Sequence, residues 1–374
     1  MTYAVDADVR VAATLDAAFY GDEAAYAATR ERVFARTWQW VGDLQDVGAP
    51  GSFAPRELLP GLVDEPLLIA RDAGGALRCL SNVCTHRGNI LVHAPGTGTH
   101  IRCGYHSRRF DLAGRMTFMP EFQDARNFPS RDDDLAQIPI DSWAGHGFVA
   151  LDPAAPIVDF VGDMATQVSA MSVAEFRRDP TRDREYRINA HWALYVENYL
   201  EGFHIPFVHP ALAESVEYAS YEDRLFPLSS LQIAFARPGE VAFARSSGIA
   251  FARPGEVAFA PEPDSERRVA ALYWWIFPNL MLNFYPWGLS VNLVQPEGLD
   301  RTRVSFRSYV RDAALLDHGA GSNLDRVEAE DEAIVQAVQK GVRSRFYRRG
   351  RYSPKRERGV HHFHRLLARF LNRD

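Results

Sequence analysis

Two short pairs of cysteine and histidine carry the first chemistry of this sequence. The first pair is Cys84 and His86, which enclose one residue. The second pair, Cys103 and His106, follows after sixteen intervening residues. Two thiolates and two imidazoles are the ligand set of a Rieske-type [2Fe–2S] cluster, in which each iron takes one kind of ligand. Because imidazoles in place of two thiolates raise the reduction potential, the pattern predicts a one-electron relay.

A zinc site is the alternative interpretation of the same four residues, because zinc accepts these donors at similar spacings. The single residue inside the first pair argues against it, since zinc knuckles usually place two residues there. Cys79, the third of three cysteines, has no partner at a ligand spacing and is expected to be a buried strand residue. The sequence therefore predicts no disulfide framework.

A second group of potential ligands lies in the middle of the chain. Glu201 and His204 are three residues apart and would share one face of a helix expected over 191–204. His209 would miss that face, but Pro206 interrupts the helix and lets the chain bring both imidazoles to one point. Two histidines and a carboxylate form the facial triad of non-haem iron(II) oxygenases. Taken alone, two histidines near a helix end are more often part of a polar surface than a pair of metal ligands.

The third ligand of such a triad is expected on a helix over 324–340. Asp331 lies on the apolar stripe of this helix, and a carboxylate on a buried face needs a metal or a paired cation. An arginine partner is therefore the alternative to a metal. The stripe consists of Leu324, Val327, Ile334, Val335 and Val338, whereas Glu328, Glu330 and Glu332 fall mainly elsewhere.

The elements that must position these residues divide the chain into two domains. Short strands such as 66–70 and 147–151 follow an amphipathic helix expected over 22–37. Beyond residue 155, helices over 164–177, 191–204 and 324–340 alternate with strands over 271–277, 280–285, 288–295 and 302–310. We expect residues 40–155 to form the cluster domain and 156–374 an α+β catalytic domain, with the helical segment 1–39 packed on the latter.

Composition agrees with an enzyme of one large or two ordinary domains. The 374 residues are 47% hydrophobic and 24% charged, with a net charge of −6. The first twenty residues contain no apolar run, so neither a signal peptide nor a membrane span is expected, and the cytoplasm is the expected location. The mild acidity and the lack of interleaved basic and aromatic residues argue against nucleic acid as a partner.

On these motifs the chain resembles the oxygenase α subunit of the Rieske non-haem iron ring-hydroxylating family. Arg87-Gly88 and Tyr105-His106-Ser107 resemble its two cluster-binding loops. The branch of this family that includes choline and carnitine monooxygenases is the most similar in two segments. These are the sequence over 197–204 and the C-terminal sequence from 338–341 through 361–364. The resemblance implies an α+β protein with an all-β Rieske [2Fe–2S] domain ahead of a helix-grip (START-like) catalytic domain. It also implies a head-to-tail homotrimer.

The resemblance also implies a role for each motif residue. In such trimers the cluster of one subunit reduces the iron of its neighbour, and Glu201 would connect the two sites. Asn198, one turn before Glu201, would hydrogen-bond behind the iron ligands or face solvent. The cluster ligands would be Cys84, His86, Cys103 and His106, and the ligands of mononuclear Fe(II) would be His204, His209 and Asp331.

The reaction implied by the family uses O2 and electrons from NAD(P)H. Because the chain has no Gly-rich dinucleotide fingerprint, the electrons are expected from a separate flavin and iron–sulfur reductase or a ferredoxin. The expected reaction is hydroxylation of a small aromatic or specialised metabolite. The first alternative is monooxygenation or N-demethylation of a quaternary ammonium compound of the choline, betaine or carnitine type. The second, of another class, is an electron carrier without oxygenase activity.

Seven aromatic residues and one asparagine on the expected strands are candidates for the substrate pocket. They could cage a cation by cation–π attraction or simply pack the core, and strand alternation would place every second one at the pocket. The set is Tyr273, Trp274, Trp275, Phe277, Asn283, Phe284, Tyr285 and Trp287.

Two further features lie outside these motifs. Residues 233–244 recur unchanged at 249–260, and each copy is expected to form two short strands around an Arg-Pro-Gly-Glu turn. Residues 340–374 hold twelve Lys or Arg and two acidic residues. This basic tail, residues 340–374, could bind an acidic ferredoxin or reductase through complementary charge. Alternatively, it could form a solvated basic helix.

Overall fold

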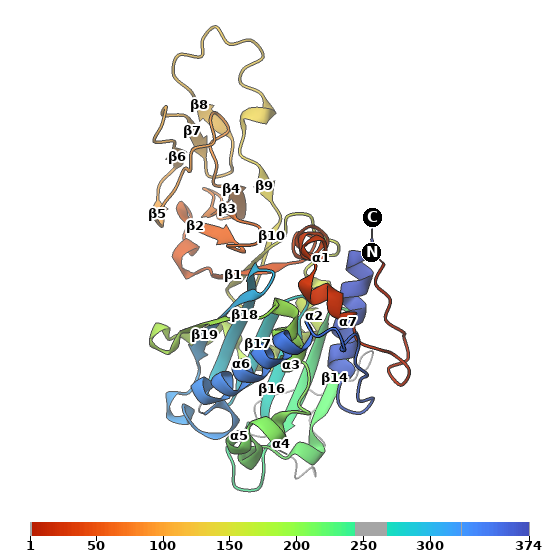
Figure 1. Ribbon diagram of the computed structural model, residues 1–374. Coiled ribbons are helices and arrows are strands. Elements are labelled where there is room, and N and C mark those ends of the chain that lie inside the picture. Colours follow the sequence, from red (N-terminus) through yellow and green to blue (C-terminus); the bar gives the residue numbers. More distant parts are fainter. Residues whose placement is uncertain (1, 244–267, 323, 374) are drawn as a thin grey trace. The chain divides into compact units, whose positions relative to one another are not determined.

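The computed structural model describes residues 2–243, 268–322 and 324–373 (Figure 1). The chain divides into two compact units. One unit is formed by Ala35–Ala154, and the other combines Met1–Phe34 with Ala155–Asp374. The N-terminal segment thus belongs to the same unit as the second half of the chain. The second copy of the repeat, 249–260, lies outside the described residues.

The unit over 35–154 is built from small antiparallel sheets. The largest has the strand order β5-β2-β3-β4-β9. Buried Leu68, Leu80 and Phe110 lie in one core cluster beneath the loops that follow β4 and β6. The strands are β1 (Gln39–Asp43), β2 (Ser52–Leu58), β3 (Glu65–Arg71), β4 (Leu77–Ser81), β5 (Gly96–Thr97), β6 (His100–Arg102), β7 (Arg109–Asp111), β8 (Met116–Phe118), β9 (Gln137–Ile138), β10 (Ile140–Trp143) and β11 (His146–Val149).

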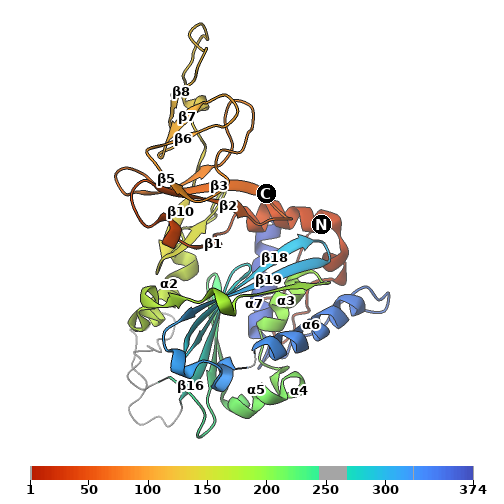
Figure 2. The ribbon, with the colours of Figure 1, turned by 90° about the vertical axis from the view of Figure 1, so that its left-hand side faces the viewer.

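The other unit is an antiparallel sheet with the order β12-β19-β18-β17-β16-β15-β14, to which β13 is added at β19. Figure 2 shows helices α3, α6 and α7 against one face of this sheet. The strands are β12 (Arg177–Arg178), β13 (Arg184–Ile188), β14 (Glu222–Phe226), β15 (Ser229–Phe235), β16 (Val269–Ile276), β17 (Leu280–Tyr285), β18 (Gly288–Gly298) and β19 (Arg301–Val310). A long sheet covered by helices is the α+β architecture expected from the sequence.

The helices of this unit are mostly short. The α-helices are α1 (Glu23–Thr29), α2 (Val158–Gln167), α3 (Trp192–Tyr199), α4 (Ile205–Val208), α5 (Pro210–Ser215), α6 (Leu324–Gly341) and α7 (Arg358–Leu371). A π-helical turn covers Arg30–Phe34. The 3-10 turns of this unit occupy Ala17–Gly21, Ser169–Met171, Val173–Glu175, Pro180–Arg182, Tyr218–Ser220, Ala313–Leu315 and Gly319–Gly321, and those of the unit over 35–154 occupy Gln45–Val47 and Arg131–Asp133. Helix α7 buries Phe363, Leu367 and Phe370, so the basic tail is not a fully solvated helix.

Three expected helices have different bounds in the structure. The helix expected over 22–37 becomes π-helical at Arg30 and ends at Phe34. The helix expected over 164–177 runs instead over Val158–Gln167, and the left-handed φ of 52° at Ser172 separates the two short turns that follow. The helix expected over 191–204 ends at Tyr199. Beyond it the Glu201 carboxylate accepts the backbone N–H groups of residues 203 and 204, which competes with helical bonding.

Helix α6 agrees with the expected bounds but differs in its buried face. Ile334 and Val338 are 40% and 42% exposed, whereas Glu328 is only 4% exposed. The expectation that Glu328 falls off the buried stripe is therefore wrong. The helix is rotated toward Glu328, Val335 and Gln339 because the Tyr195 hydroxyl supplies a buried hydrogen-bond partner for Glu328.

The first copy of the repeat forms one strand rather than two. Its first residues end β15, and the backbone N–H of Glu240 donates to Arg237 to close the expected turn. Residues 241–243 are not a strand, although the N–H of Phe243 donates to Val269. Within the described residues, no helix is long and apolar enough to cross a membrane.

Candidate functional site

The two cysteine–histidine pairs lie in the loops after β4 and β6. Each loop closes on its own cysteine, because the carbonyl oxygens of Cys84 and Cys103 accept the N–H groups of Gly88 and Ser107. Both cysteines are 2% exposed. The rings of His86 and His106 lie with their centroids 4.9 Å apart. Two loops of the same turn type thus present one buried sulfur and one imidazole each.

The surroundings of these side chains favour metal ligation. Burial raises the pKa of the Cys84 thiol. Burial also opposes ionisation of Cys103, but hydrogen bonds to its sulfur, led by the backbone N–H groups of Tyr105 and His106, lower the pKa of this thiol overall. The Nδ1 atom of His106 is buried and has no hydrogen-bond partner among the described residues. Buried sulfurs that accept N–H groups, beside an unpartnered ring nitrogen, fit the ligand set of a [2Fe–2S] cluster.

Two other residues of this region behave differently from the ligand set. Cys79 is buried in β4, as expected, and burial raises the pKa of its thiol to about 12, which keeps it unreactive. Arg108 is 2% exposed and donates to the Thr85 hydroxyl at 2.7 Å and to Asp133 at 3.2 Å. Arg108 therefore ties the two loops together, a role that no local sequence pattern indicated.

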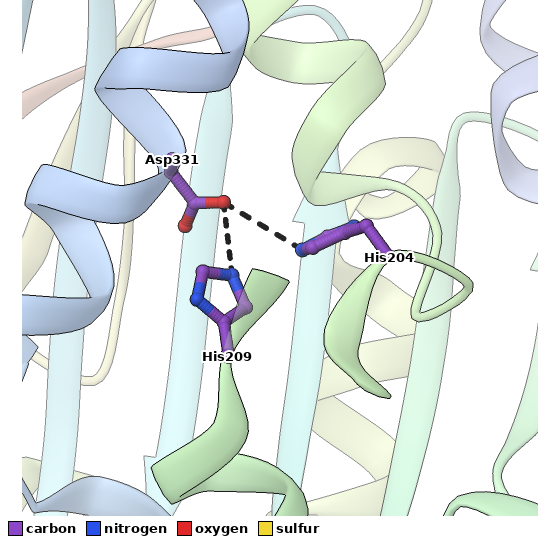
Figure 3. Close-up of side chains that lie close together, drawn as sticks. All are labelled: His204, His209 and Asp331. Carbon is purple, nitrogen blue, oxygen red and sulfur yellow. Dashed lines mark hydrogen bonds and ion pairs between the residues drawn. The ribbon is translucent and has the colours of Figure 1, made fainter. Parts of the chain in front are cut away.

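In the other unit, the structure brings together His204, His209 and Asp331 (Figure 3). The Asp331 Oδ1 atom lies 3.1 Å from His209 Nε2 and 3.6 Å from His204 Nε2. One possible ligand atom from each residue lies within 4.8 Å of the others. Two imidazole nitrogens that face one carboxylate oxygen match the donor set of a two-histidine, one-carboxylate iron(II) site.

The local fold that places these ligands differs from a single bent helix. Helix α3 stops at Tyr199, and His204 directly precedes α4, which carries Pro206 in its first turn. His209 follows α4, and Pro210 then begins α5. Proline fits the first turn of a helix, where its missing N–H costs nothing. The two prolines thus start new helices on either side of His209.

Each of the three residues is oriented by another polar side chain. Asn198 donates to Asp331 Oδ1 at 2.6 Å, so it faces the site and not solvent. Glu201 contacts His204 Nδ1 at 2.7 Å. Glu330 contacts His209 Nδ1 at 2.8 Å. Such partners fix the tautomer and direction of metal-binding side chains.

The electrostatics of this group favour cations. Burial lowers the pKa of His209, but hydrogen bonds and charges of Asp331 and Glu330 raise it overall. The hydrogen bond from His209 lowers the pKa of Glu330. The described residues that contact the Asp331 carboxylate are Asn198, His204 and His209, so the arginine partner considered from the sequence is not observed. Glu330 was missed because its partner is distant in the sequence.

A cavity of about 110 Å³ lies beside these three residues. Six aromatic rings line it, from Tyr195, Tyr199, Tyr221, Tyr273, Tyr285 and Phe306. Of the residues expected at the pocket, Tyr273, Asn283 and Tyr285 reach the cavity. The others, Trp274, Trp275, Phe277, Phe284 and Trp287, are buried in the core.

Core packing explains this division. Strand alternation turns Trp274 and Phe284 away from the cavity, while Trp275 packs on Phe363 of α7. On α3, the spacing of Tyr195, Asn198 and Tyr199 places all three on one face, and this helical signal could have identified the two tyrosines. Tyr221 and Phe306 carry no comparable pattern.

Hydrogen bonds hold several of the tyrosines that line the cavity in place. The Tyr199 hydroxyl donates to Asn283 at 2.6 Å. The Gln232 amide donates to the Tyr199 carbonyl at 2.6 Å and accepts from the Tyr221 hydroxyl at 3.2 Å. Burial raises the pKa of Tyr199 and of Tyr221, so both phenols stay neutral. The cavity is therefore preformed and uncharged on this side.

Comparisons with protein families match both units of the chain. Residues 37–129 match the Rieske [2Fe–2S] domain. Residues 175–373 match the catalytic domain of the ring hydroxylating alpha subunit. The first match overturns the zinc interpretation of the cysteine–histidine pairs.

Curated relatives match almost the whole chain. The carnitine monooxygenase oxygenase subunit of Escherichia coli (strain K12) is 28% identical over 370 residues, which cover 95% of this chain and 93% of the relative. The chloroplastic choline monooxygenase of Arabidopsis thaliana is 28% identical over 377 residues, which cover 95% of this chain and 82% of that protein.

Solved structures show the same fold. The quaternary ammonium Rieske monooxygenase CntA has a TM-score of 0.76 at 23% identity and covers 98% of this chain and 99% of its own. Naphthalene 1,2-dioxygenase from Rhodococcus sp. has a TM-score of 0.72 at 19% identity and covers 96% of this chain and 94% of its own. With both domains matched in order, the chain belongs to the Rieske ring-hydroxylating oxygenase α-subunit family and is an oxidoreductase.

Proposed function

We propose that this protein is the oxygenase component of a multicomponent system that oxidises a quaternary ammonium compound. The observation that carries the substrate class is the cavity beside His204, His209 and Asp331, which six aromatic rings line. Aromatic faces attract an ammonium cation, by about 0.5–2 kcal/mol for each ring depending on desolvation. The similarity to carnitine and choline monooxygenases supports the same class.

The proposed roles of the residues follow from their contacts. His204, His209 and Asp331 would hold mononuclear Fe(II), and the four loop residues Cys84, His86, Cys103 and His106 would hold the [2Fe–2S] cluster. When bound, the iron supplies oxygen-activating chemistry and the cluster supplies single electrons. Asn198 and Glu330 keep Asp331 and His209 in position through hydrogen bonds of 2.6 Å and 2.8 Å.

Glu201 is proposed to link the two redox sites. Its carboxylate holds His204 Nδ1 at 2.7 Å and also accepts the backbone N–H of His204 at 3.0 Å. In a homotrimer, this carboxylate would lie between His204 and His106 of the partner subunit. The electrons would reach the cluster from NAD(P)H through a flavin and iron–sulfur reductase or a ferredoxin, with O2 as the co-substrate.

Turnover of defined compounds tests the proposed substrate class. Iron-loaded protein would be supplied with a surrogate reductase, NADH and O2, together with choline, glycine betaine, carnitine or simple arenes. Product masses and formaldehyde would be recorded. Oxygen-dependent conversion of a methylammonium compound is expected. Hydroxylation of an arene, with no methylammonium compound converted, would overturn the proposed substrate class while leaving the oxygenase assignment intact.

A further inference from the structure

One buried carboxylate of the cavity has no part in the site described so far. Glu328 lies on α6, three residues before Asp331, and is 4% exposed. Its side chain lines the same cavity as the three candidate iron ligands. Residues three apart on a helix are neighbours, so a group bound at Glu328 would lie close to the iron site.

The hydrogen bonds of Glu328 leave one carboxylate oxygen unsatisfied. Its Oε2 atom accepts the Tyr195 hydroxyl at 2.7 Å. Its Oε1 atom is buried and has no hydrogen-bond partner among the described residues. A buried polar atom without a partner is costly, and in native structures it commonly marks a place that a ligand fills.

The charges around Glu328 favour a positive ligand. Within the described part of the chain, the residues that line the cavity include three carboxylates and no Lys or Arg. Burial raises the pKa of Glu328 well above its usual range, and the charges of Asp331 and Glu332 act in the same direction. The titratable groups that face it are these two on α6, Tyr195 on α3 and Tyr186 on β13. Because a nearby cation favours the ionised carboxylate, Glu328 is expected to ionise when such a ligand enters.

We propose that Glu328 determines substrate specificity: its free Oε1 atom pairs with the cationic group of the substrate and disfavours substrates that also carry a carboxylate. The inference rests on the proposed function and narrows it. A quaternary ammonium alcohol such as choline would be preferred over zwitterions such as glycine betaine and carnitine. Tyr195 acts as a positioning residue, because its hydroxyl holds Oε2 and leaves Oε1 as the carboxylate oxygen without a hydrogen-bond partner among the described residues.

Binding to the holoenzyme tests this proposal without turnover. Isothermal titration calorimetry would compare choline with its uncharged isostere 3,3-dimethyl-1-butanol and with glycine betaine. Wild-type protein is expected to bind choline about tenfold more tightly than the isostere, and glycine betaine more weakly than choline. In Glu328→Gln, which keeps the shape and a hydrogen-bond acceptor for Tyr195, choline should lose about tenfold in affinity, while the isostere stays unchanged.

Matched controls separate this effect from misfolding. Glu332→Gln removes a carboxylate from the same helix that does not line the cavity, and it should keep the preference for choline. Iron content and the visible spectrum of the cluster establish that each variant is loaded. Wild-type protein offers a second measurement, because ionisation of Glu328 on choline binding should release a proton. The observed enthalpy should then depend on the ionisation enthalpy of the buffer for choline, and not for the isostere.

Several outcomes would overturn the proposal. These are equal affinity of the wild type for choline and its isostere, an unchanged preference in Glu328→Gln, tight binding of glycine betaine, and the absence of binding by every probe. Loss of oxidative turnover with selective choline binding intact would instead count against the proposed function alone.

Discussion

At the scale of single residues, the candidate iron site is a set of paired contacts. Asp331 is held by Asn198, and His204 by Glu201. His209, which is 1% exposed, is held by Glu330. Each imidazole thus has one nitrogen engaged by a carboxylate and the other directed at Asp331. The three side chains together offer the two nitrogen donors and the carboxylate donor of the proposed iron site.

The first prediction concerns Asp331. Replacing it by Ala should abolish binding of mononuclear iron, because two imidazoles alone bind Fe(II) weakly. The cluster, held by other residues, should keep its visible spectrum. Iron analysis after removal of loosely bound metal measures the loss, and Glu332→Ala on the same helix is the control. Full retention of iron at this site in Asp331→Ala would refute the ligand assignment.

The second prediction compares two buried cysteines. Cys103→Ser should remove the visible absorption and the electron paramagnetic resonance signal of the reduced cluster, since serine is a poor cluster ligand. Cys79→Ser should retain both, because Cys79 is an inert thiol in β4. The spectra of the two variants, recorded at equal protein concentration, decide the matter. An intact cluster in Cys103→Ser would contradict the assigned ligands.

At the scale of elements, α3 and α6 together present the residues of the candidate site in the unit whose long sheet is covered by helices. Helix α3 presents Tyr195 and Asn198, and α6 presents Glu328 and Asp331, so that hydrogen bonds join the two helices twice. The start of α3 is fixed by His191, whose Nδ1 atom accepts the N–H of Ala193 at 3.3 Å. Helix α3 therefore begins at a buried histidine cap and carries Asn198, which holds Asp331, near its other end. A change at the cap is expected to shift the candidate iron site.

This cap gives the third prediction, a dependence of stability on pH. Burial lowers the pKa of His191 to about 3, so the folded protein keeps this ring neutral while the unfolded chain takes up a proton near pH 6.5. The free energy of unfolding should therefore fall as the pH drops below 6.5, by about 1 kcal/mol from this group between pH 6.5 and 5.5. His191→Asn keeps a capping oxygen without titrating. Chemical unfolding at both pH values should show a smaller loss for the variant, and equal losses would contradict the prediction.

At the scale of the whole molecule, the chain carries its two redox sites in separate compact units. The cluster residues lie in the unit over 35–154, and the candidate iron ligands lie in the other. Each unit has its own sheets and its own core, so damage to one site is expected to leave the other folded. The proposed homotrimer, in which electrons cross between subunits, makes this separation testable.

The fourth prediction is complementation between two inactive variants. Cys103→Ser subunits lack the cluster but can bind iron, and Asp331→Ala subunits have the opposite defect. In each mixed trimer formed by co-expression, one neighbouring pair out of three combines an intact cluster with an intact iron site, which should restore about a third of the wild-type activity per subunit. A mixture of the separately assembled variants is the control. No recovery in verified mixed trimers would exclude transfer between subunits.

Local sequence patterns were sufficient to predict the family, the order of the two domains and the cluster motif. The cysteine–histidine pairs lie within short loops, and their residue types are dictated by the metal chemistry. Helical periodicity likewise pointed to Asp331 on α6. The same periodicity failed for Glu328, and no pattern indicated Glu330, because each has a partner more than a hundred positions away in Tyr195 or His209.

The tertiary structure alone decided which residues reach the cavity and which way α6 is turned. Strand alternation left two possible faces, and only packing against α3 and α7 placed Tyr273 at the cavity and Trp275 in the core. Ligand types and spacing are local properties of a sequence, whereas burial and charge pairing arise only when distant segments meet.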